Sequence, residues 1–196
     1  DQGCPTGIPT VDVRERPRWD VFYAGHLDEA GRFERLARIQ QAGLRVLCCG
    51  DTTSVGVPEG VTAMPWMDPM RLFELASNCS VGLVDSYRLD VAGYWSDRLW
   101  LYLGMGMPSV VLRQEDMLPH YPIMRGIATV CAERDMMGFL RYLSGAAGWD
   151  ARRVMSASSR RFVQSEHTYE HRCQEILECF SPTKQPSAEL VAAADL

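Results

Sequence analysis

The chain has 196 residues, of which 46% are hydrophobic and 23% charged, and its formal net charge is −5. This length and apolar content suit one globular domain whose core is large enough to fold without disulfides or metals. The acidic balance gives no reason to expect a nucleic acid or an anionic membrane as a partner. We also expect no membrane span, because no apolar run approaches the roughly 18 residues that such a span needs.

Apolar runs alternate with segments of helical periodicity along a predicted domain at 19–180. Residues 1–18 are expected to form an irregular lead-in, and the composition of 181–196 predicts a frayed tail. The predicted strands are 19–25, 44–50, 60–66, 81–85, 108–112 and 127–131. The predicted helices lie within 26–43, 68–79, 94–106, 133–143, 150–164 and 168–179.

Individual residues refine these helices. Asp68 is predicted to cap the helix at 68–79, with Met70 turned toward the core. Trp95 is predicted on the apolar face of the helix at 94–106, which ends at a glycine-rich turn. The arginine pairs at 152–153 and 160–161 predict a solvated helix face.

The predicted strands are apolar throughout instead of alternating between apolar and polar residues. Such strands, separated by helices, are typical of an α/β domain in which helices cover both faces of a parallel sheet. Ligands of such sheets bind outside the carboxyl ends of the strands, near the point where the strand order reverses. This edge would hold residues 25–26, 50–51, 64–66, 85–87 and 94–98.

Seven cysteines are scattered along the chain without a CxxC pair. Their odd number and irregular spacing predict reduced, mostly buried thiols in a cytoplasmic protein, not a disulfide framework or a zinc site. The basic residues are nineteen arginines and one lysine, Lys184. Chemistry that depends on a lysine, such as a Schiff base or a phosphate-loop lysine, is therefore not expected in the domain.

The stretch GYWSDR, residues 93–98, lies at the predicted start of a helix on the ligand edge. Helix N-termini attract anions, and Arg98 adds a planar charge that suits phosphate. The structural alternative places Trp95 in the core, uses Ser96 or Asp97 as a helix cap, and pairs Arg98 with a carboxylate. The sequence leaves both interpretations open.

Two further positions on this edge could contact a ligand. Gly25, which precedes His26, would let the backbone approach a phosphate or a sugar, although a simple strand-to-helix turn would also place a glycine there. Trp66 could stack on a base, or it could be anchored in the core. No GxGxxG motif opens the first helix, which argues against a dinucleotide site.

The stretch HTYEHR, residues 167–172, places two histidines four residues apart, a spacing that suits two metal ligands on one helix face. A third ligand is not evident, and His167 precedes the predicted helix, so we favour a structural role. Thr168 is predicted to cap the last helix, with Tyr169 packed inward. The chain has no DxD motif to hold a metal on a sugar nucleotide, and no metal or cofactor is predicted. The absence of a GxSxG motif disfavours a hydrolase of the nucleophile-elbow kind.

Four stretches together resemble a known family, the CgeB-like, spore-protein-type glycosyltransferases. HTYEHRCQEIL at 167–177 is similar to the family's C-terminal signature, and SDRLWLYLGMGMPSVV at 96–111 is similar to a region shared with GT-B glycosyltransferases. DVFYAG at 20–25 resembles the strand that opens the C-terminal Rossmann-like domain, and NCSVGLVDSY at 78–87 resembles its fourth strand. The resemblance covers about 20–180.

This resemblance implies a single Rossmann-like domain, one half of a GT-B fold, that binds a nucleotide-diphosphate sugar without a metal. Arg98 would be the catalytic residue, offsetting charge on the leaving diphosphate. The acceptor site would lie on a missing N-terminal domain or a partner chain. The residues implied to bind the donor are Gly25, His26, Trp66, Asp85, Tyr94, Trp95, Ser96 and Asp97.

One position departs from the family pattern. The acidic residue that many GT-B proteins carry three positions after the arginine, where it holds the donor ribose, is Leu101 in this chain. That role would pass to Asp97 or Asp85. Alternatively, the domain has lost its donor contacts and serves as a non-catalytic interaction module.

Overall fold

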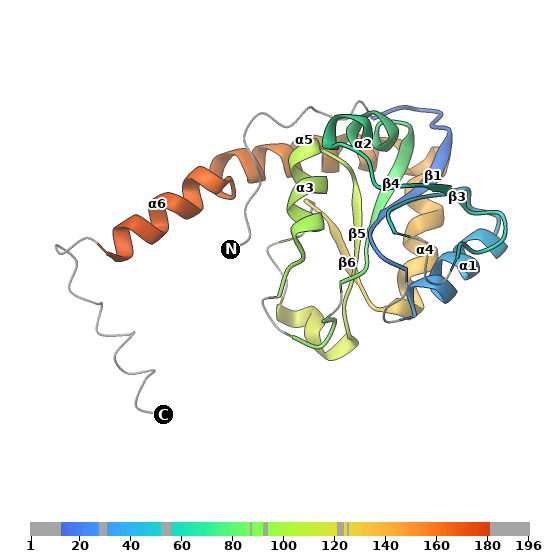
Figure 1. The fold of residues 1–196 in the computed structure, drawn as a ribbon, viewed down its shortest axis with the longest axis horizontal. Coiled ribbons are helices and arrows are strands. Elements are labelled where there is room, and N and C mark those ends of the chain that lie inside the picture. The colour runs from blue at the N-terminus through green and yellow to red at the C-terminus, as the bar shows by residue number, and fades with distance from the viewer. Residues whose placement is uncertain are drawn as a thin grey trace.

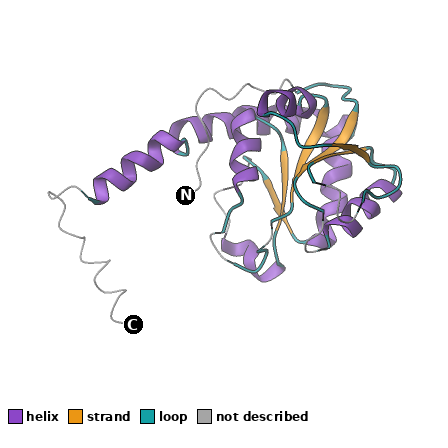
Figure 2. Ribbon diagram, in the orientation of Figure 1, coloured by secondary structure: helices purple, strands orange, loops and turns teal. Residues whose placement is uncertain are grey.

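The computed structural model describes residues 13–27, 31–51, 56–86, 88–91, 94–120, 124 and 126–180. Residues 13–18 contain no helix or strand, while 1–12 and the predicted tail at 181–196 lie outside the described residues. One parallel sheet forms the centre (Figure 2). Its strands are β1 (Trp19–Ala24), β2 (Val46–Cys49), β3 (Thr62–Met64), β4 (Cys79–Val84), β5 (Ser109–Leu112) and β6 (Thr129–Cys131).

The six strands lie in the order β3-β2-β1-β4-β5-β6, and every neighbouring pair is parallel. The α/β class, the parallel sheet and all six predicted strands are therefore confirmed. The strand order reverses between β1 and β4, so the ends of these two strands, at Ala24 and Val84, mark the switch point.

Helices cover both faces of the sheet (Figure 1). Within the described residues, none is both long and apolar enough to cross a membrane. The helices are α1 (Arg32–Gln41), α2 (Pro69–Ala76), α3 (Asp97–Met105), α4 (Glu133–Ser144), α5 (Trp149–Glu166) and α6 (Tyr169–Cys179), with short 3-10 helices at Glu115–His120 and Ala146–Gly148.

The sheet separates two apolar cores. On one face, α2 and α3 pack against strand residues such as Phe22 and Leu47. On the other face, α1 and α4 pack against Val21 and Val46. Successive residues of a strand point to opposite faces, so covering both faces requires strands that are apolar at every position.

Helix α3 begins three residues later than predicted. The backbone of Ser96 is extended, with φ −80° and ψ 148°, and takes the N-cap position. Trp95 therefore lies outside the helix, half-buried against the core. The later start puts Arg98 in the first turn of α3. The predicted glycine-rich end is confirmed, because Gly106 is the C-cap in a left-handed conformation.

The predicted burial of Met70 and the predicted exposure of Arg152 are both wrong. Asp68 caps α2 as predicted, but Met70 is 57% exposed, since Leu72 and Phe73 form the buried face of that helix. Arg152 is fully buried instead of lying on a solvated face. Its guanidinium donates hydrogen bonds to four backbone carbonyls, which offset the cost of burying the charge.

The buried thiols are unreactive. Cys48 and Cys49 lie within β2, as predicted, and both are fully buried. Burial raises the pKa of Cys48 to about 11 and that of Cys49 to about 12. Both thiols are therefore protonated at neutral pH, whereas the nucleophile or metal ligand would be a thiolate.

HTYEHR forms the junction between α5 and α6. Thr168 is the N-cap of α6, as predicted, because its hydroxyl accepts a hydrogen bond from the backbone N–H of His171. The backbone N–H of Thr168 in turn donates a hydrogen bond to Nδ1 of the His171 ring, which completes a capping box. The His167 ring instead stacks on Trp100 of α3, with centroids 4.5 Å apart. Tyr169 is 43% exposed, so the prediction that it packs inward is wrong.

We expect the stability of the chain to depend on His167 at mildly acidic pH. Burial, reinforced by Arg172, lowers the pKa of His167 below its usual value. The unfolded chain therefore binds this proton at a higher pH than the folded chain, and the free energy of unfolding falls as pH drops from about 6.5 to the native pKa. Urea unfolding at a series of pH values measures this slope.

The matched control is His167→Gln, which keeps a polar side chain but cannot titrate. The variant should lose the part of the pH dependence that lies just below about pH 6.5. An identical slope in both proteins would contradict the assignment to His167.

Candidate functional site

Arg98 lies at the switch point of the sheet. Its Nη1 donates a hydrogen bond to the backbone carbonyl of Asp85, 3.1 Å away, and its guanidinium carbon stands 4.8 Å from the centroid of the Tyr23 ring. None of the ion pairs formed by the described residues involves Arg98. Its hydrogen-bonding and ring partners are thus neutral groups, and it forms no ion pair with a carboxylate of the described residues.

Gly25 makes room for Arg98. A Cβ atom on Gly25 would lie 2.2 Å from Nη2 of Arg98, and the backbone φ of +152° is one that other residues rarely adopt. The space beside the glycine is therefore filled by the protein's own arginine, not left open for a ligand. The missing side chain of Gly25 therefore determines where the Arg98 guanidinium can lie at this edge.

Asp85 is buried, and its carboxylate pairs with Arg35 of α1. Its Oδ2 lies 2.5 Å from Nη1 of Arg35, and Arg35 also pairs with Glu133 at the start of α4, at 3.2 Å. Burial raises the pKa of the Asp85 carboxyl, and the charges of Arg35, Arg32 and Arg98 oppose that rise. The Asp85 carboxylate therefore links the end of β4 to α1, and the Asp85 carbonyl accepts the hydrogen bond from Arg98.

His26 and Trp66 come together at the same edge of the sheet. Their rings meet edge to face, with centroids 5.8 Å apart and an angle of 65° between the ring planes. Trp66 is 54% exposed, so the alternative of a core tryptophan is wrong. An exposed indole held in place by a neighbour offers a flat apolar surface to another ring.

The segment before α3 is held by Arg113, the residue that follows β5. Its Nη2 donates to the carbonyl of Tyr94 at 2.5 Å, and its guanidinium carbon lies 5.1 Å from the centroid of the Trp95 ring. The hydroxyl of Ser96 is buried and has no hydrogen-bond partner within the described residues. Asp97 is exposed in the first turn of α3, where its negative charge interacts favourably with the helix dipole.

The structure thus joins the predicted residues into two groups. Gly25, Asp85 and Arg98 are in direct contact, and His26 pairs with Trp66. Three buried arginines at this edge, Arg32, Arg35 and Arg113, are not predicted by the motifs.

Arg113 directly follows β5, so the rule that ligands bind beyond the carboxyl ends of strands could have found it. Arg35 gives no comparable signal. It occupies the buried face of α1, where periodicity predicts an apolar residue.

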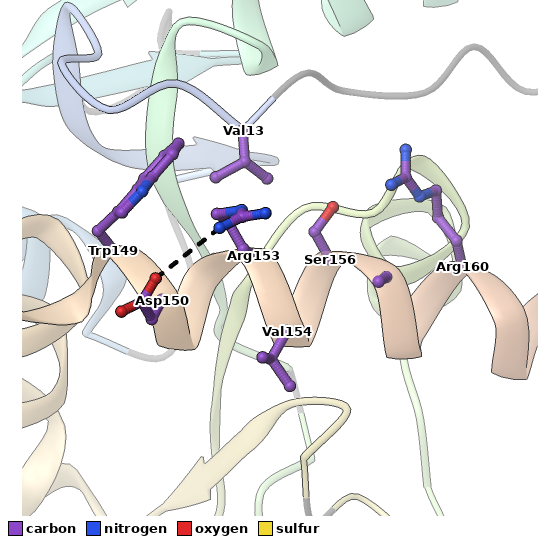
Figure 3. Close-up of a pocket in the computed structure, with 8 residues that line it drawn as sticks. Val13, Trp149, Asp150, Arg153, Val154, Ser156 and Arg160 are labelled. Atoms are coloured by element: carbon purple, nitrogen blue, oxygen red, sulfur yellow. Dashed lines mark ion pairs between the residues drawn. The ribbon is translucent and has the colours of Figure 1, made fainter.

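An open cavity of about 670 Å³ lies elsewhere, between Val13 and the outer face of α5. Figure 3 shows Arg153, Ser156 and Arg160 along the helix side that faces Val13. Its lining includes none of the predicted donor-binding residues, so it does not contribute to the site at the sheet edge.

The sequence model of a family described as glycosyl transferase-like matches residues 32–178. The chain belongs to this family. The match spans α1 to α6 and includes Asp85, Arg98 and Arg113, while Gly25 and His26 precede it.

Solved structures share the fold. The chain is similar to sucrose-phosphate synthase from Thermosynechococcus elongatus, with a TM-score of 0.67 and 16% identity over 98% of this chain and 52% of that one. It is also similar to an O-GlcNAc transferase mutant from Thermobaculum terrenum, with a TM-score of 0.60 and 15% identity over 91% of this chain and 38% of that one. No curated protein matches the chain.

At these identities the similarity shows the fold alone, and it supports the predicted single α/β domain with a parallel sheet. The chain spans about half of the synthase and a smaller share of the transferase.

Replacing Gly25 with alanine should destabilise the chain by about 1–3 kcal/mol, because the backbone is strained and the new Cβ meets Arg98. The same change should cost less in an Arg98→Ala background, where the clash is removed. A double-mutant cycle, measured by urea unfolding, reports the difference.

Gly43→Ala is the matched control. Gly43 has a φ of +86° but no atom within 4 Å of the position of a Cβ, so alanine there adds strain without a clash. Its cost should be the same with and without Arg98. If Gly25→Ala behaves like this control, the contact between Gly25 and Arg98 does not shape the edge.

Proposed function

We propose that the chain is the donor-binding half of a GT-B glycosyltransferase and binds the diphosphate of a nucleotide sugar at the carboxyl edge of the sheet. The observation that carries this proposal is the placement of Arg98 in the first turn of α3 at the switch point, without an ion pair to any described carboxylate. A fixed guanidinium at a helix N-terminus favours an anion. Family membership and fold support the same assignment.

Arg98 acts on the leaving group. Sugar transfer breaks the bond between the anomeric carbon and the diphosphate, so negative charge grows on the diphosphate oxygens. A guanidinium already held by the Asp85 carbonyl and the Tyr23 ring stabilises that charge without reorganising. The N–H groups at the start of α3 add hydrogen bonds, and no metal or cofactor is needed.

The remaining predicted residues surround the diphosphate. Trp66 and His26 provide the exposed aromatic surface for the base. Tyr94 and Trp95 border the start of α3, and the exposed carboxylate of Asp97 is placed to accept hydrogen bonds from the ribose. Asp85 enters as a positioning residue, because its carboxylate is buried against α1.

A second, acceptor-binding half completes the enzyme, in the same polypeptide or in a partner chain. The chain spans only 52% of sucrose-phosphate synthase, which leaves room for such a half. Helix α6 supplies a surface for it, since it has no buried residue and projects away from the sheet (Figure 1). Its exposed apolar side chains, Tyr169, Ile176, Leu177 and Phe180, fall on one helical stripe.

The proposed subgroup and location rest on the sequence. The CgeB-like assignment depends on the stretch at 167–177, and a cytoplasmic location depends on the reduced state of the cysteines. Both stay predictions.

Arg98→Ala should weaken donor binding by about tenfold to a hundredfold, as expected when a hydrogen bond to a charged group is lost. Calorimetric titration of the chain with UDP-, GDP- and dTDP-glucose measures this loss. Arg38→Ala is the matched control, because this exposed arginine on α1 pairs with Glu133 away from the switch point. Its affinity should stay within about twofold of the unmodified chain.

A different outcome would favour the interaction module. Leu101, where an acid is expected, packs against the apolar core. If the unmodified chain bound none of the three nucleotide sugars while Leu101→Glu bound one, the natural chain would have lost donor binding. Equal affinities for the unmodified chain and Arg98→Ala would overturn the role given to Arg98.

Replacing both Leu177 and Phe180 with serine should lower sugar transfer to the acceptor by about tenfold or more in the enzyme that contains both halves, since central apolar side chains dominate interfaces. Donor affinity should be unchanged, because α6 lies outside the donor site. Gln174→Ser, at an exposed polar position of α6 outside the apolar stripe, is the control for both quantities. A parallel loss of transfer and donor affinity would instead indicate general unfolding.

A further inference from the structure

Arg113 connects three segments at the carboxyl edge. Its Nη1 donates to the carbonyl of Leu112 at 2.7 Å and to the hydroxyl of Ser86 at 3.3 Å, while its Nη2 donates to the carbonyl of Tyr94 at 2.5 Å. Ser86 follows β4, Leu112 ends β5, and Tyr94 precedes α3. One buried guanidinium, 1% exposed, therefore ties the ends of two neighbouring strands to the segment that leads into α3.

This connection lies next to the residues that hold Arg98. Ser86 is adjacent to Asp85, whose carbonyl accepts the hydrogen bond of Arg98. Tyr94 and Trp95 immediately precede Ser96, the N-cap of α3, and the Trp95 ring lies beneath the Arg113 guanidinium. Arg113 therefore holds the start of α3 indirectly, through Tyr94. It also holds Asp85, whose carbonyl accepts the Arg98 hydrogen bond, indirectly through Ser86.

We infer that Arg113 is a positioning residue of the donor site, which sets the start of α3 relative to the end of β4 so that Arg98 and the helix N–H groups converge on one anion. The inference rests on the proposed function for its ligand, but its structural part concerns only the described residues. Arg113 does not contact the diphosphate, because its side chain is buried and engaged with the protein. Misplacing such a support by about 1 Å can cost a factor of a hundred in rate.

Arg152 provides a control with the same chemistry at another place. It too is fully buried, donates hydrogen bonds to backbone carbonyls, and lies over an aromatic ring, that of Trp149. Its partners belong to the 13–18 segment and to the region between α4 and α5, and none is a predicted donor-binding residue. Loss of Arg152 should therefore destabilise the fold without changing the donor edge.

The experiment compares Arg113→Met and Arg113→Lys with Arg152→Met and Arg152→Lys. Amide hydrogen exchange of residues 94–99 is measured first, without ligand, under conditions in which all variants are folded by circular dichroism. We expect faster exchange in this segment for Arg113→Met, an intermediate rate for Arg113→Lys, and the unmodified rate for both Arg152 variants. Lysine rescues only in part because it carries one ammonium where arginine presents a planar fork.

Calorimetry with UDP-, GDP- and dTDP-glucose then measures the dissociation constant of each variant. Arg113→Met should bind about tenfold more weakly than the unmodified chain, as expected for a misplaced site, with Arg113→Lys in between. The Arg152 variants should bind within about twofold of the unmodified chain, even where their melting temperatures fall as far as that of Arg113→Met.

The two measurements separate the possible failures. If the amide hydrogen-exchange rate of residues 94–99 is the same in the Arg113 and Arg152 variants, Arg113 is a general stabilising residue. The inference is then wrong, whatever the calorimetry shows for the nucleotide sugars. If no nucleotide sugar binds the unmodified chain but exchange rises only in the Arg113 variants, the positioning stands while the proposed function fails. If exchange rises but affinity is unchanged, Arg113 positions a segment that the donor does not use, and the inference is again overturned.

Discussion

The guanidinium of Arg98 occupies the space that a side chain at residue 25 would fill, and the carboxyl edge of the sheet is arranged around that fit. Gly25 directly follows β1, and a Cβ on it would lie 2.2 Å from Nη2 of Arg98. Asp85 gives Arg98 a carbonyl because its carboxylate is turned toward Arg35. The result is a cation oriented by neutral groups at the point where a parallel sheet binds its ligands.

Buried arginines hold the connections that the sheet itself cannot hold. Hydrogen bonds between parallel strands fix the strands but leave the loops beyond them unsupported. Arg35 joins α1 to the end of β4 and the start of α4, Arg113 joins β4 and β5 to α3, and Arg152 joins the 13–18 segment to α5. A planar group with five donors can satisfy several acceptors at once, and lysine lacks this capacity.

The strands could be predicted from the sequence, because short apolar runs that end in glycine or in a polar residue are typical of buried parallel strands. The meeting of Gly25, Asp85 and Arg98 at the carboxyl edge follows from the positions of these strand ends. The same reasoning failed for residues whose position differs from what their periodicity or charge predicts. Periodicity placed Trp95 inside α3, although the extended backbone at Ser96 delays the helix. Charge placed Arg152 in solvent and gave no sign of Arg35, because a buried arginine is recognisable only once its acceptors are known.

Helix α3 links the two ends of the proposed enzyme. Its first turn presents Arg98, and two residues later Trp100 stacks on His167 at the base of α6. Phe162 of α5 packs on the same His167 ring, with centroids 4.4 Å apart, so the base of α6 is fixed by aromatic contacts on two helices. A partner that binds the apolar stripe of α6 would therefore contact a helix whose base packs on α3, the helix that carries Arg98. The proposed acceptor half and the proposed donor site would thus be connected through α3.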